Sequence, residues 1–150
     1  MEQHNIFTEM VLTLFRVNGS LIAWGNHQLE PLKLTSARWQ IIGAMGRIGA
    51  ATTNPQIARM MGVSRQGTQK QLNLLLAEGL VEQYINEQHQ KSPLYALTEK
   101  GQYLFEQTEQ IWLQQIPLLI DGINQQELLI TLKTLNTLLN NTVALDHLHK

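Results

Sequence analysis

One stretch decides the fold, residues 64–79, and it reads SRQGTQKQLNLLLAEG. Ser64 predicts a helix start, because its hydroxyl can accept a hydrogen bond from an amide left unpaired in the first turn. Gly79 predicts the end, because glycine enters the left-handed region without strain. Between them, apolar positions recur at i, i+4 and i+7, which indicates an amphipathic helix with one buried stripe. The stripe consists of Thr68, Leu72 and Leu75.

The opposite face of this helix is polar. Its side chains are of the kinds that recognise DNA, since arginine suits guanine, glutamine and asparagine suit adenine, and lysine suits backbone phosphate. A helix face that is merely solvated is polar too, so this face alone leaves both interpretations open. The residues are Arg65, Gln66, Gln69, Lys70 and Asn73.

A shorter helix is predicted just before, in residues 53–63, which read TNPQIARMMGV. Asn54 can cap it, Pro55 suits its first turn and Gly62 ends it. A short helix, a tight turn and a longer polar-faced helix are the layout of a helix-turn-helix, whose second helix enters the major groove of DNA.

After Gly79 the apolar spacing changes from 3.6 to 2 residues, which is typical of strands. Residues 80–85 and 94–97 predict a hairpin with a polar tip at 86–93, and residues 51–53 could add a short third strand. Together these elements predict a winged helix-turn-helix.

Three segments of the chain resemble the MarR family of bacterial transcription regulators: residues 34–42 (LTSARWQII), residues 56–81 and residues 95–101 (YALTEKG). Their order and spacing match, with a long helix before them and two after, so the resemblance covers nearly the whole chain. It implies an obligate homodimer whose two winged lobes bind a pseudo-palindromic DNA operator.

The expected fold is mainly α, in a single domain over residues 1–150. Residues 34–101 form the winged lobe, with three helices and a β-hairpin wing. The helices of residues 5–30 and 102–142 are too apolar for that lobe alone to cover, and the resemblance implies that they intertwine as a dimerisation region. Alternatively, they dock a different protein. We expect the helix that begins after Thr98 to kink or end at Pro117.

Composition narrows the classes of function. The 150 residues are 43% hydrophobic, enough for one domain with a core or for one protomer of an interlocked dimer. The absence of cysteine excludes thiol redox sensing and disulfides. No uninterrupted apolar run approaches the roughly 18 residues of a membrane span, and no signal peptide is recognised. We therefore expect no membrane partner and a cytoplasmic location.

The net charge of −1 is unevenly distributed. Residues 36–100 carry seven basic and four acidic side chains, a net +3, and the rest of the chain carries −4. This asymmetry fits a DNA-facing lobe on an acidic scaffold, although an ordinary solvated surface could also produce it.

The predicted DNA contacts extend beyond the polar helix face. Ser64, Thr53 and the helix start at Asn54 and Gln56 suit phosphate. Members of the family commonly carry arginines at the wing tip, but here the tip reads NEQHQKSP and leaves only His89 and Lys91. Minor-groove contact is therefore in doubt. The full set is Thr53, Asn54, Gln56, Ser64, Arg65, Gln66, Gln69, Lys70, Asn73, His89 and Lys91.

The resemblance also implies a small effector, often aromatic and anionic, bound between the dimer region and the winged lobe. By position the candidates are Trp24, His27, Arg38 and Trp39. Core packing explains the tryptophans equally well, and Arg38 could equally hold the dimer together or form an ion pair with Glu30.

No enzyme, metal or cofactor is expected. The histidines at 4, 147 and 149 are scattered, and no phosphate loop or nucleophile motif is present. Two hypotheses remain: a homodimeric, ligand-released DNA-binding regulator, most simply a repressor, and a winged-helix protein-interaction module with weak or lost DNA binding. The arginine-free tip and an outward-facing Leu74, where the family often has a basic residue, support the second.

Overall fold

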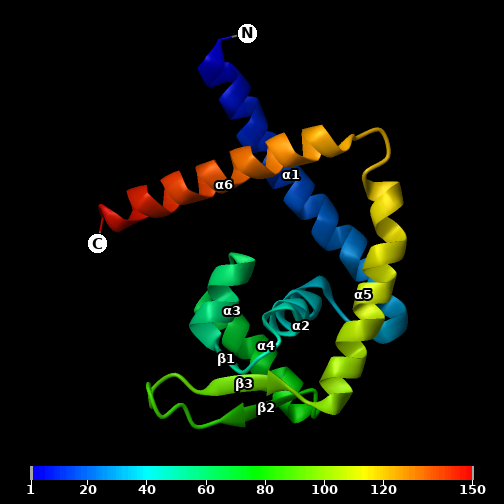
Figure 1. Ribbon diagram of the computed structural model, residues 1–150, viewed down its shortest axis with the longest axis vertical. Helices are drawn as coiled ribbons and strands as arrows, with labels where there is room; N and C mark the ends of the chain where they lie inside the picture. The colour runs from blue at the N-terminus through cyan, green and yellow to red at the C-terminus, as the bar shows by residue number, and fades with distance from the viewer. Residues whose placement is uncertain (1, 150) are drawn as a thin grey trace. The chain divides into compact units, whose positions relative to one another are not determined.

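The computed structural model describes residues 2–149, which are mainly helical with one small sheet (Figure 1). The chain divides into two compact units, one ending at Ile111 and one beginning at Trp112. The elements are α1 (Gln3–Leu29), the 3₁₀ helix η1 (Glu30–Leu32), α2 (Ser36–Ile48), β1 (Thr52–Thr53), α3 (Asn54–Met61), α4 (Arg65–Ala77), β2 (Val81–Tyr84), β3 (Leu94–Leu97), α5 (Glu99–Leu119) and α6 (Gln125–His147).

The predicted stripe of α4 forms the centre of the first unit's core. Thr68, Leu72 and Leu75 are completely excluded from solvent, together with Ile42 of α2 and Ile57 of α3. The Thr68 hydroxyl can be buried because it donates a hydrogen bond to the Ser64 carbonyl, at 2.9 Å. Ser64 caps α4 as predicted, since its Oγ accepts from the Gly67 amide at 2.9 Å.

The sheet has the order β1-β3-β2, and both pairings are antiparallel. Thr52 pairs with Tyr95 and Val81 with Leu97. The short third strand and the hairpin are therefore confirmed. Figure 1 shows β2 and β3 extending from the helices as the wing. Tyr95 anchors the wing, because its ring is buried at 2% exposure.

Three local features of the helices differ from the simplest interpretation of the sequence. The glycines at 46 and 49 suggest that α2 ends near Met45, but the helix continues to Ile48. At Gly46 the Phe105 ring approaches so closely that a β-carbon there would lie 2.5 Å from it. α5 runs through Pro117 and ends at Leu119. Leu76 is not an exposed leucine but is half-buried against the core.

The expectation about membrane spans also needs correction. Residues Gln3–Leu32 form one continuous helical segment that is long and apolar enough, by length and composition, to cross a membrane. A few polar residues interrupt the apolar run in this segment. Its mean hydropathy over 18 residues nevertheless remains as high as that of a membrane span. A core helix or a signal sequence satisfies the same criterion, so this property does not distinguish between them.

The start of α5 is joined to the turn that follows α4. The Thr98 hydroxyl donates to the Gly79 carbonyl at 2.7 Å and accepts from the Gly101 amide at 3.1 Å. The Thr98 amide donates to the Leu80 carbonyl at 3.1 Å. Gly101 permits this approach, because a β-carbon there would lie 1.9 Å from the Leu80 carbonyl oxygen.

We expect Gly101→Ala to lower the free energy of unfolding by about 2 kcal/mol, because the added methyl forces α5 away from the Leu80 backbone. Gln102→Ala is the control, since Gln102 is exposed on the same turn and should change stability by at most about 0.5 kcal/mol. Urea unfolding measures both. Equal effects of the two variants would contradict the close approach.

Candidate nucleic-acid interface

The outward face of α4 presents three long polar side chains. Arg65, Gln66 and Lys70 are exposed, and within residues 2–149 their side chains make no hydrogen bond or ion pair. Their positions are set by the buried stripe on the other side of the helix. These side chains are therefore free to bind a partner, and their guanidinium, amide and ammonium groups suit base edges and phosphate.

The cap of α3 differs from the sequence-based expectation. Thr53, not Asn54, is the N-cap: its hydroxyl accepts from the Gln56 amide, and the Gln56 side chain accepts from the Thr53 amide at 2.9 Å. The Gln56 Oε1 also accepts from the Thr52 hydroxyl at 2.9 Å. This reciprocal pair is a capping box, which satisfies both backbone amides at the helix start. Gln56 and Thr53 thus fix the start of α3, the first helix of the helix-turn-helix.

Asn54 instead joins α3 to α4. Its amide nitrogen donates to the Arg65 carbonyl at 3.0 Å and to Gln69 Oε1 at 2.9 Å. Gln69 in turn donates to Asn73 Oδ1 at 2.9 Å and to the Tyr95 hydroxyl at 3.2 Å. One chain of hydrogen bonds therefore runs from α3 across α4 to β3. It orients the amides of Gln69 and Asn73 on the helix face before any partner arrives.

The comparisons with known proteins agree with this geometry. Residues 32–92 match a family model described as the MarR family. The chain has the fold of solved transcription regulators: the transcriptional regulator BldR from Sulfolobus solfataricus superposes with a TM-score of 0.82, at 18% identity, over 94% of this chain and 99% of that one. The resemblance to the MarR family is confirmed.

Two other solved relatives were determined with DNA. A mutant of MarR from E. coli complexed with operator DNA superposes with a TM-score of 0.72 at 23% identity, covering 95% of this chain and 99% of that one. The S. aureus MepR–DNA complex superposes with a TM-score of 0.73 at 19% identity, covering 87% and 96%.

A curated relative, an uncharacterized protein of Mycobacterium tuberculosis, is 39% identical over 92 residues, which cover 61% of this chain. The chain matches 63% of that relative's length, and the same holds for a relative from Mycobacterium bovis.

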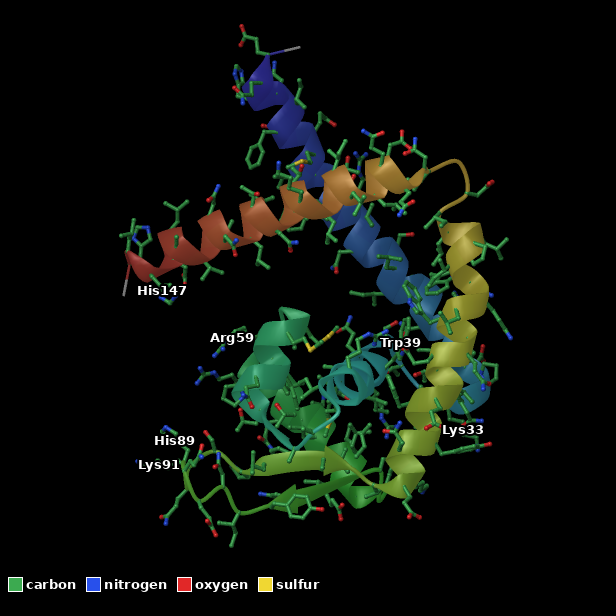
Figure 2. The ribbon with its side chains drawn as sticks, in the orientation of Figure 1. Lys33, Trp39, Arg59, His89, Lys91 and His147 are labelled. Atoms are coloured by element: carbon green, nitrogen blue, oxygen red, sulfur yellow. The ribbon has the colours of Figure 1, made fainter. Side chains whose placement is uncertain are left out.

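The wing lacks the arginines that the MarR resemblance would place at its tip. His89 and Lys91 lie in the exposed tip loop, as Figure 2 shows. The loop is held by the Asn86 side chain, whose amide donates to the Ser92 carbonyl at 2.9 Å. On β2 the Glu82 carboxylate accepts a hydrogen bond from Tyr84 and raises the pKa of that phenol above 10.0. The acidic groups of the wing would repel phosphate.

Arg59 is a cation that the predicted set left out. It is exposed on α3, and Figure 2 shows its side chain pointing outward from that helix. Its position three residues before Gly62, at the end of a short helix, was visible in the sequence. Only the fold shows that it belongs to the surface of the winged lobe.

Of the four predicted effector residues, the structure brings Trp24 and Trp39 into contact. The rings of Trp24 and Trp39 pack together with centroids 6.2 Å apart, where α1 crosses α2. His27 is exposed. Arg38 pairs with Glu78 at the end of α4. The alternative in which Arg38 pairs with Glu30 is therefore not what the structure shows, because the salt bridge of Arg38 is to Glu78.

Asn54→Ala should lower the free energy of unfolding by about 1 kcal/mol, because it removes both hydrogen bonds from the Asn54 amide to α4. Gln66→Ala removes an exposed amide with no partner in the described part of the chain and should have at most half of that effect. Thermal and urea unfolding would measure the difference. A neutral Asn54→Ala would contradict the structural role given to the hydrogen-bond chain.

Proposed function

We propose that this chain is a homodimeric, sequence-specific transcription regulator of the MarR type that binds a pseudo-palindromic operator, most simply as a repressor. The observation that carries the proposal is the outward face of α4. A helix whose buried stripe is fully packed presents Arg65, Gln66 and Lys70 without internal partners. Such a helix is what the major groove admits in helix-turn-helix proteins.

In this proposal the contacts divide into two groups. Arg65, Gln66 and the preoriented amides of Gln69 and Asn73 read base edges, since their donors and acceptors match guanine and adenine. Lys70, Ser64 and the start of α3 bind phosphate and set the position on the duplex. Asn54 contributes chiefly by joining α3 to α4, and Thr53 and Gln56 contribute by capping α3. His89 and Lys91 supply the wing's only cations at its tip.

The terminal helices support dimerisation. On α1, Phe7, Leu12 and Phe15 are 48%, 49% and 72% exposed, far more than such side chains are in a finished core. On α6, whose described side chains include none that is buried, leucines recur along the helix and leave an apolar face uncovered. Extended apolar faces that remain exposed on a single chain mark surfaces on which proteins associate. A two-fold dimer also fits two half-sites about one helical turn apart.

The proposal places the protein in the cytoplasm with its DNA and includes release by a small molecule. Release requires an effector that binds one arrangement of the two lobes better than the other. No enzymatic activity, metal or cofactor is part of the proposal. Among the residues that the structure describes, no three histidine, cysteine or acidic side chains lie close enough to hold a metal ion.

A second candidate function is a winged helix that contacts protein and binds DNA weakly. Two exposed apolar side chains favour it: Leu74 on α4 is 44% exposed, and Ile85 at the base of the wing tip is 83% exposed. Both lie on surfaces that the first proposal assigns to DNA. Measured DNA affinity separates the two candidates.

The decisive measurement is fluorescence anisotropy at physiological salt. It titrates DNA from upstream of the protein's own gene against a shuffled duplex of equal length. We expect a preference of about a hundredfold or more, within the range of specific binding, with two protomers per duplex. The Arg65→Ala/Lys70→Ala variant should lose about a hundredfold in affinity, because one base contact and one phosphate contact disappear in each half-site.

The control for that variant is Arg16→Ala/Lys133→Ala, which removes the same two kinds of charge outside the winged lobe and should leave DNA affinity unchanged. Operator affinity that survives loss of Arg65 and Lys70 would refute the assigned surface. Equal, weak binding of both duplexes by the unaltered protein would favour the protein-contact function.

Dimerisation is tested by mass in solution. Light scattering should give twice the 17.1 kDa of the chain. Leu132→Glu should produce monomers, because it places a charge in the apolar face of α6, where Leu132 is 56% exposed. Lys133→Glu is the matched control on the adjacent, polar side of the helix and should leave the dimer intact. A monomeric unaltered protein at micromolar concentration would contradict the dimer.

A further inference from the structure

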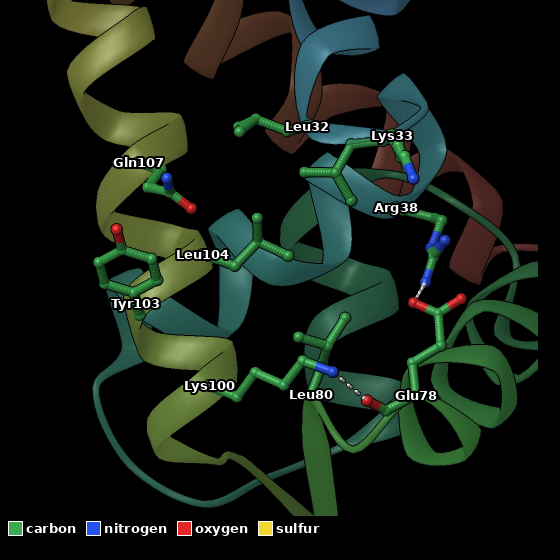
Figure 3. Close-up of a pocket in the computed structure, with 10 residues that line it drawn as sticks. Leu32, Lys33, Arg38, Glu78, Leu80, Lys100, Tyr103, Leu104 and Gln107 are labelled. Carbon is green, nitrogen blue, oxygen red and sulfur yellow. Dashed lines mark hydrogen bonds and ion pairs between the residues drawn. The ribbon is translucent and has the colours of Figure 1, made fainter.

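A cavity of about 460 Å³ opens in the first unit, between η1, the start of α2, the end of α4 and the first turns of α5. Its size lies within the usual range of small-molecule sites. None of the predicted effector residues except Arg38 lines it. Figure 3 shows the lining side chains, with Leu80 beside the end of Lys100 and with dashed lines from Arg38 and Lys100 to Glu78.

The cavity has a cationic wall. Lys33, Arg38 and Lys100 line it against a single acid, Glu78, which leaves a formal net charge of +2. The Lys33 ammonium group makes no hydrogen bond or ion pair with any residue of the described chain, and the Lys33 backbone is in the left-handed region at φ 55°. Lys33 is the one residue other than glycine with positive φ in residues 2–149. Backbone strain of this kind concentrates at binding sites.

Arg38 is only partly satisfied. Its side chain is 15% exposed, one Nη donates to the Glu78 carboxylate, and its Nε is buried with no partner in the structure. A buried donor without an acceptor is costly and marks a place where a second acceptor would bind. Lys100 is also held in place, because its Nζ donates to the Glu78 backbone carbonyl at 3.0 Å.

The remaining wall of the cavity is aliphatic. Leu32, Leu34, Leu80 and Leu104 line it, and the one aromatic ring, Tyr103, is 63% exposed at the rim. A ligand that satisfies both walls carries one anionic head group and a short, flexible hydrocarbon tail. We infer that this cavity is a binding site for a medium-chain carboxylate. The head group of the ligand replaces the Glu78 carboxylate as the partner of Arg38 and also contacts Lys33.

Glu78 links this site to α4. It is the C-cap residue of α4, and its pairing with Arg38 and Lys100 ties that end of the helix to α2 and α5. A carboxylate that displaces the Glu78 side chain removes the tie to α2 and shifts the orientation of α4. This consequence rests on the proposed DNA-binding function, whereas the binding site itself does not.

The site is tested on the purified protein without DNA, by isothermal titration calorimetry with sodium octanoate and with 1-octanol. Octanoate should bind with a dissociation constant of about 1 mM or below, and octanol at least about tenfold more weakly, because only the carboxylate pairs with the cations. No saturable octanoate binding, or equal affinity for octanol, would overturn the inference.

Variants test the two roles of charge. Lys33→Gln should weaken octanoate about fivefold, whereas Lys91→Gln, which removes a lysine from the wing, should leave the affinity unchanged. Glu78→Gln should tighten octanoate about threefold, because no carboxylate then competes for Arg38. Equal effects of the two lysine variants, or weaker binding by Glu78→Gln, would overturn the assigned geometry.

The link to DNA is tested with the duplex that the protein prefers. Saturating octanoate should raise the dissociation constant for that duplex in the unaltered protein and have a smaller effect, at the same concentration, in Lys33→Gln. Octanoate that binds without changing DNA affinity would overturn the link. If no duplex is preferred while octanoate still binds, the proposed function fails and the site stands.

Discussion

Burial of one side of α4 is the constraint on which the rest of the winged lobe depends. Thr68, Leu72 and Leu75 are fully excluded from solvent, and they pack among apolar side chains from α2, α3 and the wing. Burying such side chains contributes on the order of 2 kcal/mol each, which makes rotation of the helix about its axis very costly. The direction of Arg65, Gln66 and Lys70 follows from that burial.

The two ends of α4 are held differently. At its beginning, Ser64 and the hydrogen bonds of Asn54 fix the helix to α3 and preorient its polar amides. At its end the attachment is an ion pair, from Glu78 to Arg38, supplemented by Lys100. The ion pair is partly exposed, with side-chain exposures of 15% for Arg38 and 46% for Glu78, so a dissolved anion can compete with Glu78 for Arg38. An anionic ligand that binds Arg38 can therefore release the end of α4 while the beginning of α4 stays attached to α3.

Much of this arrangement follows from local sequence. The cap at Ser64, the buried stripe of α4 and the capping box that Asn124 and Glu127 form at the start of α6 were predictable, because each depends on residues within one or two helical turns. The short strand at 52–53 was predictable only as an extended segment, since its partner Tyr95 is distant in the sequence. The Thr53 cap was missed because Thr53 and Asn54 are both good caps, and only the reciprocal bond from Gln56 decides between them. The close packing of the Phe105 ring on Gly46 could not be predicted, because the two residues are 59 positions apart in the sequence.

The sequence by itself determined the helices and strands of this protein, their order and the polarity of their faces, because helix and strand periodicities depend on residues that are close together in the sequence. Tertiary structure alone decided which charged groups meet. Arg38 finds Glu78, 40 residues on, and not the nearby Glu30, and the two tryptophans of the expected effector site pack on each other. The physical reason is the separation of the interacting residues along the chain. The periodicity of a helix or strand involves residues a few positions apart, whereas an ion pair or a cavity forms only where the folded core brings distant segments together.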